Sequence, residues 1–160
     1  MDPLSEAIRK SGADAYVMYA NSRDADMRYM TKFVTSDPFV FFRKAGGRDT
    51  IIISQMEIGR ASRESPAAVM TRAEARLPEI LKKEKDPLRA TAKMIAGQAG
   101  KKILVPPQFP VGLARALEKY CTVIVDSGTI LSMRAEKSHA EIAAMRRVQK
   151  VTETALGLGV

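Results

Sequence analysis

Histidine and cysteine side chains often act as metal ligands or nucleophiles, and this chain has one of each, His139 and Cys121. Hydrolysis assisted by two metal ions needs carboxylates and histidine converging on metals about 3.5–4 Å apart. No second histidine can share a metal with His139, which we therefore predict to be exposed in the first turn of a helix. Cys121 begins an apolar stretch, so we interpret it as an inert core thiol. The sequence thus assigns no catalytic and no metal-binding residue.

Two further patterns have the composition of functional sites but not their spacing. Residues 97–102, Gly-Gln-Ala-Gly-Lys-Lys, lack the four-residue gap of a phosphate loop and the Ser or Thr that follows its lysine. This stretch also precedes a predicted strand, whereas a phosphate loop follows one. The acidic pairs Asp24 with Asp26 and Glu84 with Asp86 are interpreted as helix starts or surface charges.

The composition is that of an ordinary globular domain with excess positive charge. Of the 160 residues, 46% are hydrophobic and 28% are charged, which suits one domain with a core. The formal net charge of +8 suggests a nucleic-acid or other anionic partner. However, basic residues are interleaved with acidic ones, and no aromatic residues alternate with them to form a stacking surface. We therefore interpret the charge as a solvated surface and expect no nucleic-acid partner.

The sequence also bears on the cellular location. No apolar run approaches the ~20 residues that cross a bilayer, and the first residues lack the basic and then apolar order of a signal peptide. A lone cysteine favours a reducing compartment. We expect a cytoplasmic protein with no membrane partner.

Apolar runs and turn residues predict an α/β fold. The alternation of strands and helices indicates a mixed sheet of about five to six strands with helices on both faces. Gly46 and Gly47 predict an antiparallel hairpin between the second and third strands. Strands are predicted at 14–19, 38–43, 50–54, 67–70, 102–106 and 121–125. Helices are predicted at 3–10, 55–65, 74–85, 86–99 and 110–120.

Two of these helices carry apolar stripes that should face the core. In the helix at 86–99, Asp86 is the predicted cap and Pro87 occupies the first position. Its stripe consists of Leu88, Ala92, Ile95 and Ala96. The stripe of the helix at 110–120 consists of Val111, Ala114 and Leu117.

A long helix is predicted from Ser138 toward the end of the chain. Ser138 and Glu141 have the S-x-x-E spacing of a capping box, in which each side chain accepts a backbone hydrogen bond from the other residue. A helix of about 20 residues extends about 30 Å, which is long for a domain of this size. Apolar and small residues recur at helical spacing at Ile142, Met145, Val148, Thr152 and Ala155.

The segment that leads into this helix resembles a known family. Residues 133–142, Met-Arg-Ala-Glu-Lys-Ser-His-Ala-Glu-Ile, resemble the linker and first helix that join the two domains of creatinase, prolidase and aminopeptidase P. The matching positions of this interdomain linker include Arg134, Lys137, Ser138 and Glu141.

The resemblance implies a domain organisation and an activity. In that family a noncatalytic amino-terminal domain, with a ribonuclease H-like arrangement, precedes a pita-bread domain that holds two metal ions and cleaves the bond before a proline. By this resemblance, residues 1–132 are the amino-terminal domain, and residues 133–160 are the linker and first helix of an absent catalytic domain. The parent protein is then expected to be a metal-dependent Xaa-Pro dipeptidase or aminopeptidase.

The same resemblance implies cofactors and partners. This chain should hold no cofactor, and the parent enzyme should carry two divalent ions, Mn, Co or Zn, in the missing domain. The expected partners are a second copy of the chain in a homodimer, a catalytic domain of the same or the neighbouring chain, and short proline-containing peptides. The domain's expected work is dimerisation and control of access to the active site.

A second stretch carries the resemblance near the first strand. Tyr29-Met30-Thr31 and Phe33 are similar to the family segment Tyr-Leu-Thr-Gly-Phe. Lys32 stands where the family has glycine, and a lysine there is strained if its φ angle is positive.

The resemblance implies that this stretch lies near the subunit interface or the access channel. The candidate residues are Tyr29, Thr31, Lys32, Phe33 and Phe39. We expect a partly exposed apolar face around Tyr29, Phe33 and Phe39. The alternative is a short amphipathic helix that places Met27, Met30 and Phe33 in the core.

Two other functions remain open from the sequence. One is a stand-alone basic module that binds nucleic acid or other anions, which the charge of +8 motivates. The other is a domain of this family reused as a binding scaffold without catalysis, which fold alone does not distinguish.

Overall fold

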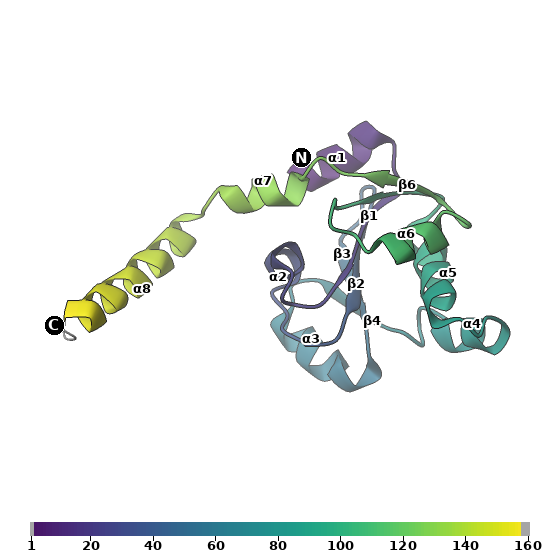
Figure 1. Ribbon diagram of the computed structural model, residues 1–160, viewed down its shortest axis with the longest axis horizontal. Helices are drawn as coiled ribbons and strands as arrows, with labels where there is room; N and C mark the ends of the chain where they lie inside the picture. Colours follow the sequence, from purple (N-terminus) through teal and green to yellow (C-terminus); the bar gives the residue numbers. More distant parts are fainter. Residues whose placement is uncertain (1, 158–160) are drawn as a thin grey trace.

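A six-stranded mixed β-sheet forms the centre of the molecule (Figure 1). The computed structural model describes residues 2–157, and the strand order is β4-β3-β2-β1-β5-β6. The strands are β1 (Ala15–Ala20), β2 (Phe39–Lys44), β3 (Asp49–Ile53), β4 (Ala68–Thr71), β5 (Lys102–Val105) and β6 (Thr122–Val125). The α-helices are α1 (Pro3–Ser11), α2 (Ala25–Thr31), α3 (Ile58–Glu64), α4 (Leu77–Lys83), α5 (Pro87–Ala99), α6 (Val111–Leu117), α7 (Thr129–Ala135) and α8 (His139–Gly157), and a short 3-10 helix, η1 (Gln55–Glu57), precedes α3.

The first three strands are antiparallel and the other strands are added in parallel. β2 pairs with β1 and β3, so that Phe41 lies between Met18 and Ile51. β5 runs parallel to β1, β6 runs parallel to β5, and β4 runs parallel to β3. These pairings confirm the predicted mixed sheet, the hairpin between the second and third strands, and the ribonuclease H-like arrangement.

Alternate side chains along the strands form two buried clusters, one on each face of the sheet. Ala15 and Val17 belong to one cluster, whereas Tyr16 and Met18 belong to the other. Helices α4, α5 and α6 contribute to the first cluster, and α1, α2, α3 and α7 contribute to the second (Figure 1). Because both faces are covered, the central strands are nearly continuous apolar runs.

Local backbone geometry and capping set the starts of α4 and α5. The helix predicted from residue 74 begins instead at Leu77, because Arg76 takes the left-handed backbone, with a φ angle of 65°, and interrupts a helix there. Glu74, in the preceding turn, accepts hydrogen bonds from the backbone nitrogen and hydroxyl of Thr71, at 2.7 and 2.9 Å. Asp86 caps α5 as predicted, and its carboxylate accepts a hydrogen bond from the backbone nitrogen of Arg89 at 3.0 Å.

Two predicted core residues are exposed. The exposed fractions of Leu88 and Val111 are 45% and 72%. Both residues lie in the first turn of their helices, whereas the buried residues of α5 begin at Ala90 and those of α6 at Leu113. The predicted stripes were therefore wrong for these first turns, which extend past the core.

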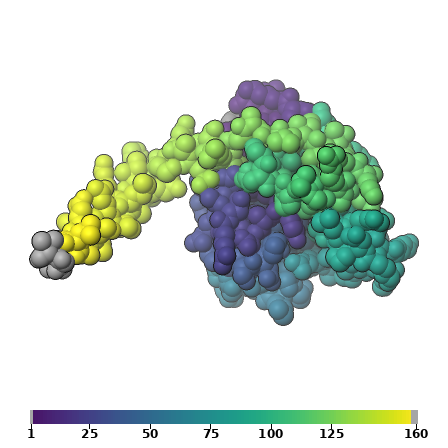
Figure 2. Space-filling view, viewed as in Figure 1, coloured from purple at the N-terminus to yellow at the C-terminus, as the bar shows by residue number. Residues whose placement is uncertain are grey.

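Two helices end the chain, and the first of them packs on the domain. α7 includes Arg134 of the expected linker and contacts α1 and α2, with Ile130 only 1% exposed. α8 extends away from the domain, and none of its described residues is buried (Figure 2). The boundary expected between residues 132 and 133 thus falls inside α7, and residues 158–160 of the expected second segment lie outside the described part. Within residues 2–157, no helix is both long and apolar enough to cross a membrane.

The turn before β5 holds the two halves of the sheet together. Asp14 Oδ2 accepts hydrogen bonds from the backbone nitrogens of Lys101 and Lys102, at 2.7 and 3.0 Å. Gly100 precedes them with a φ angle of +112°, and a Cβ atom there would lie 2.6 Å from the Asp14 side chain. Only glycine fits this position without displacing Asp14.

We predict that Gly100→Ala lowers the free energy of unfolding by about 2 kcal/mol, because both the backbone angle and the contact with Asp14 oppose a side chain. Gly97→Ala is the matched control, since Gly97 lies inside α5 with nothing within 4 Å of an added Cβ atom. That change should raise the free energy of unfolding by about 0.5–1 kcal/mol. Urea denaturation followed by circular dichroism measures both, and equal stabilities would contradict the close approach.

Candidate functional site

The polar residues of greatest interest gather at one edge of the sheet. β1, β5 and β6 are mutually parallel, so their carboxyl ends lie at the same edge. The segments that follow these strands carry Asp26, Gln108 and Arg134. Carboxyl-terminal edges of parallel strands are where functional residues of open α/β sheets converge.

Asp26 is the centre of this junction. It is only 6% exposed, and its carboxylate accepts a hydrogen bond from Arg134 Nη1 at 2.7 Å and another from Gln108 Nε2 at 2.8 Å. The side chain of Arg134 is 32% exposed, so water screens this ion pair only in part. One carboxylate thereby joins α2, the loop after β5, and α7.

The interpretation of Asp24 and Asp26 as helix-start or surface charges is confirmed in that both residues lie at the start of α2, but Asp26 is not a surface charge. Asp24 Oδ1 accepts hydrogen bonds from the backbone nitrogens of Asp26 and Met27, at 3.0 and 2.8 Å, and so caps α2. Asp26 lies in the first helical turn, where the helix dipole favours a carboxylate, but it is buried. Its partner Arg134 lies 108 residues away, a distance that no local pattern reveals.

The position of Arg134 depends on how α7 begins. Asp126 is 7% exposed and accepts hydrogen bonds from the backbone nitrogens of Gly128 and Thr129, at 3.1 and 2.6 Å, and from the Thr129 hydroxyl at 2.7 Å. Gly128 has a φ angle of 98°, which favours glycine. This turn fixes the start of α7 and therefore the direction in which Arg134 extends.

A buried tyrosine lies beside these carboxylates. Tyr16 is 0% exposed, and its hydroxyl has no hydrogen-bond partner among the described residues. Burial, and then the charges of Asp126, Asp26 and Asp24, raise the pKa of Tyr16, so the phenol stays protonated. The adjoining cavity of about 190 Å³ is smaller than the roughly 300–1,000 Å³ of typical ligand pockets. We therefore interpret it as part of the junction and not as a substrate site.

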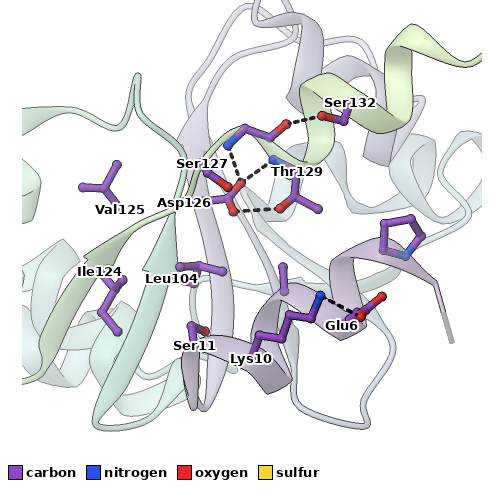
Figure 3. Close-up of a pocket in the computed structure, with 13 residues that line it drawn as sticks. Glu6, Lys10, Ser11, Leu104, Ile124, Val125, Asp126, Ser127, Thr129 and Ser132 are labelled. Carbon is purple, nitrogen blue, oxygen red and sulfur yellow. Dashed lines mark hydrogen bonds and ion pairs between the residues drawn. The ribbon is translucent and has the colours of Figure 1, made fainter.

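A larger groove of about 550 Å³ lies between α1 and the turn that precedes α7 (Figure 3). The charged groups that line it already have partners. Glu6 and Lys10 form an ion pair of 2.9 Å on one wall, and Asp126 bonds to its own turn. The groove thus offers no convergent acid and base for catalysis.

The described residues also offer no cluster of metal ligands. Among residues 2–157, no three His, Cys, Asp or Glu side chains come close enough together to hold a metal ion. His139 is exposed on α8, as predicted. Cys121 is buried, as expected of a core thiol, and burial raises its pKa.

The expected linker residues meet at the start of α8. Ser138 Oγ accepts a hydrogen bond from the Glu141 backbone nitrogen at 3.2 Å, and Glu141 Oε2 accepts bonds from the backbone nitrogen and hydroxyl of Ser138, both at 2.8 Å. These bonds confirm the predicted capping box. Together with a smaller effect of Lys32, they hold the pKa of Glu141 below its usual value. Lys137 Nζ donates to the backbone oxygens of Arg134 and Ala135.

Most of the residues expected at an interface are buried within this chain. Thr31, Phe33 and Phe39 are 0%, 0% and 3% exposed, so the expected partly exposed apolar face is wrong for both phenylalanines. Their rings pack edge to face, with centroids 5.9 Å apart, and the guanidinium of Arg60 lies 5.0 Å from the Phe33 ring centroid. This packing occupies the surfaces that a partner would need. It supports the alternative of a short amphipathic helix, whose buried residues include Met27 and Met30.

Tyr29 and Lys32 are the candidates of this set that reach the surface. Lys32 has a φ angle of 53°, so the chain does take the left-handed backbone that glycine favours, at a cost of about 1–2 kcal/mol for a lysine. Its ammonium lies 4.5 Å from the Tyr29 ring centroid, in a cation–π contact that offsets part of this strain. An interface or access role for these residues remains a prediction.

Comparisons with known proteins point to one family. A family model described as the creatinase/prolidase N-terminal domain matches residues 1–148. That span includes the sheet, α7 and the first half of α8. A search of curated proteins found no match.

Solved structures share this fold at low sequence identity. The prolidase from Pyrococcus horikoshii OT3 superposes with a TM-score of 0.71 and 18% identity, over 96% of this chain and 40% of that chain. The X-Pro aminopeptidase from Thermotoga maritima MSB8 gives 0.67 and 17%, over 94% and 41%. A Creatine_N superfamily domain of a dipeptidase from Streptococcus thermophilus gives 0.53 and 14%, over 85% and 99%. The chain thus spans about two fifths of the first two structures, and these likenesses establish the fold alone.

We predict that Asp26→Asn lowers the free energy of unfolding by about 2 kcal/mol, because Arg134 then faces a neutral group at a site mostly closed to water. Arg134→Met should have a similar effect, since it leaves a buried carboxylate with Gln108 alone. Both changes remove the same interaction. The double variant should therefore lose about 1–2 kcal/mol less stability than the sum of the losses in the two single variants.

The exposed pair of Asp86 and Arg89 provides the control for this cycle. Arg89 Nε lies 3.8 Å from Asp86 Oδ2, and the side chains of Asp86 and Arg89 are 44% and 51% exposed. Arg89→Met should therefore change the free energy of unfolding by less than about 0.5 kcal/mol. Chemical denaturation measures all four variants, and strict additivity at the junction would show that the ion pair does not couple α2 to α7.

Proposed function

Because the chain belongs to the creatinase/prolidase N-terminal domain family, we propose that it is the noncatalytic amino-terminal domain of an Xaa-Pro peptidase. The observation that carries this proposal is the family match over residues 1–148, which includes both the α/β domain and the start of α8. In this proposal a longer protein continues from α8 into a catalytic domain. The present domain then limits access to the active site and pairs with a second copy of itself.

Catalysis in this proposal belongs to the following domain, with two divalent ions, Mn, Co or Zn. The described residues do not fit such a pair of ions, because the one histidine is exposed on α8 and no acidic cluster accompanies it. No catalytic step is therefore assigned to this chain. Its contribution is to position the linker and to exclude longer peptides.

The exposed face of α8 supports a neighbouring domain. Four large apolar residues of α8 are more than half exposed to water. Full burial of such a side chain contributes roughly 1.5–3 kcal/mol of stability. We propose that the catalytic domain covers them. These residues are Met145, Val148, Val151 and Leu156, with exposed fractions of 58%, 66%, 69% and 69%.

Tyr29 and Lys32 are the proposed access residues. They lie at the end of α2, and the charge of Lys32 reaches Glu141 at the start of α8. In this proposal the catalytic domain packs along the exposed face of α8, whose first turn lies near this pair. Thr31, Phe33 and Phe39 support the pair from the core and do not contact peptide in this proposal.

We predict that residues 1–160 alone hydrolyse no Xaa-Pro dipeptide in the presence of Mn²⁺, Co²⁺ or Zn²⁺, whereas the protein encoded by the gene read past Val160 does. Release of free proline measures both. Turnover by residues 1–160, or a natural reading frame that stops at Val160, would overturn the proposal.

We also predict that Lys32→Gly in the whole protein relaxes selection against longer peptides. Glycine keeps the left-handed backbone and removes the side chain, so the fold should be retained. The ratio of kcat/KM for a dipeptide to that for a tetrapeptide should fall at least about threefold, equivalent to roughly 0.6 kcal/mol. Arg76→Gly is the matched control, because Arg76 also has a positive φ angle of 65° but lies at the start of α4. An equal change of the ratio in both variants would exclude a specific role for Lys32.

A further inference from the structure

A second groove lies among α4, α5 and the segment before β6, at the opposite end of the molecule from α8 (Figure 1). Its volume is about 500 Å³. Four cationic side chains and one acidic side chain line it, above a partly apolar floor. The charged residues are Arg76, Glu79, Lys83, Lys93 and Lys101, and the other lining residues include Ile80, Met94 and Tyr120.

The cations of this groove lack carboxylate partners. Among the described residues, none of the four forms an ion pair within 4.0 Å. All four side chains are exposed, and Glu79, the one acidic residue of the lining, pairs with none of them among the described residues. The positive charge that remains uncompensated in this groove favours an anion.

Two of these cations extend from backbone positions that are fixed at the rim of the groove. The Lys101 nitrogen donates to Asp14 Oδ2 at 2.7 Å, directly after Gly100, where no side chain fits. Arg76 has a φ angle of 65° and begins α4, with the Ile80 nitrogen donating to its carbonyl oxygen at 3.1 Å. A left-handed arginine costs about 1–2 kcal/mol, and strain of this kind is concentrated at functional sites.

We propose that this groove binds a small organic phosphate of mononucleotide size. Lysine and arginine bind phosphate oxygens through charge-assisted hydrogen bonds. The volume of about 500 Å³ lies within the roughly 300–1,000 Å³ range of small-molecule sites. The half-buried ring of Tyr120 and the half-buried side chain of Ile80 give a planar base an apolar surface to contact.

The groove suits a mononucleotide better than a nucleic-acid strand. Strand-binding surfaces carry several aromatic residues in succession along an extended basic path. This groove contains one aromatic residue among its lining residues. The site therefore has space and contacts for one base and its phosphate.

The test is titration of residues 1–160 with AMP at low ionic strength, followed by amide chemical shifts. We expect shifts confined to α4, α5 and the residues around Lys101 and Tyr120, and much weaker binding at 0.5 M salt, where the Debye length is only a few ångströms. Lys93→Glu with Lys101→Glu should weaken binding at least about tenfold, the effect of losing one or two charge-assisted hydrogen bonds.

Two variants separate binding from folding and from net charge. Arg146→Glu with Lys150→Glu on α8 makes the same change of charge far from the groove and should leave AMP binding unchanged. Arg76→Gly should weaken AMP binding while raising the midpoint of thermal unfolding, because glycine relieves the positive φ angle.

Four outcomes would overturn the proposal. The first is the absence of any chemical-shift change at about 10 mM AMP, a concentration at which even a weak specific site would be largely occupied. The second is that the α8 control weakens AMP binding as much as the groove variant does. The third is that inorganic phosphate binds as tightly as AMP, and the fourth is that a single-stranded oligonucleotide binds more tightly than AMP through the same lysines. The third would remove the role of Tyr120, and the fourth would assign the groove to nucleic acid.

Discussion

A carboxylate withdrawn from water must find hydrogen-bond donors within the protein, and Asp26 imposes this requirement on three distant segments. Its donors are Gln108, after β5, and Arg134, on α7. The sheet order β1-β5-β6, with all three strands parallel, makes the meeting possible, because the segments that follow them leave from one edge. Loss of the bond to Arg134 would leave the buried carboxylate with Gln108 alone, so the end of the domain and the start of the linker are specified together.

The strands and the sheet class followed from local patterns, because apolar runs and turn glycines act over a few residues. The capping box of Ser138 and Glu141 and the cap at Asp86 were predictable for the same reason. The burial of Asp26 was not predictable in this way, because it depends on an ion pair with a residue 108 positions later in the sequence. Likewise, the exposure of Phe33 depended on whether Arg60 and Phe39 would cover its ring. The spacing of residues within α2 carries no information about that contact.

Lys32 and Arg76 are the two described non-glycine residues with positive φ angles, and both are cations that begin or end a short helix. The sequence identified one of them, through the glycine that the family carries at that position, and gave no signal for the other. Sterically both positions suit glycine better. The left-handed backbone fixes the direction of the Cα–Cβ bond at each position, whereas the long exposed side chain beyond it keeps its rotamer freedom.

The charge of +8 is therefore informative only when its location is known. At the junction end, Arg134 is neutralised by Asp26, and the charge of Lys32 acts on Glu141, so positive charge there strengthens contacts within the chain. At the far end, the cations around Tyr120 have no such partners among the described residues. The average charge of the chain describes neither end, because Coulomb interactions between exposed groups fade within about 10 Å at ordinary ionic strength. Each end must then be understood from its own few residues, and at the far end the proposed anion site rests on cations that line one groove without ion-pair partners among the described residues.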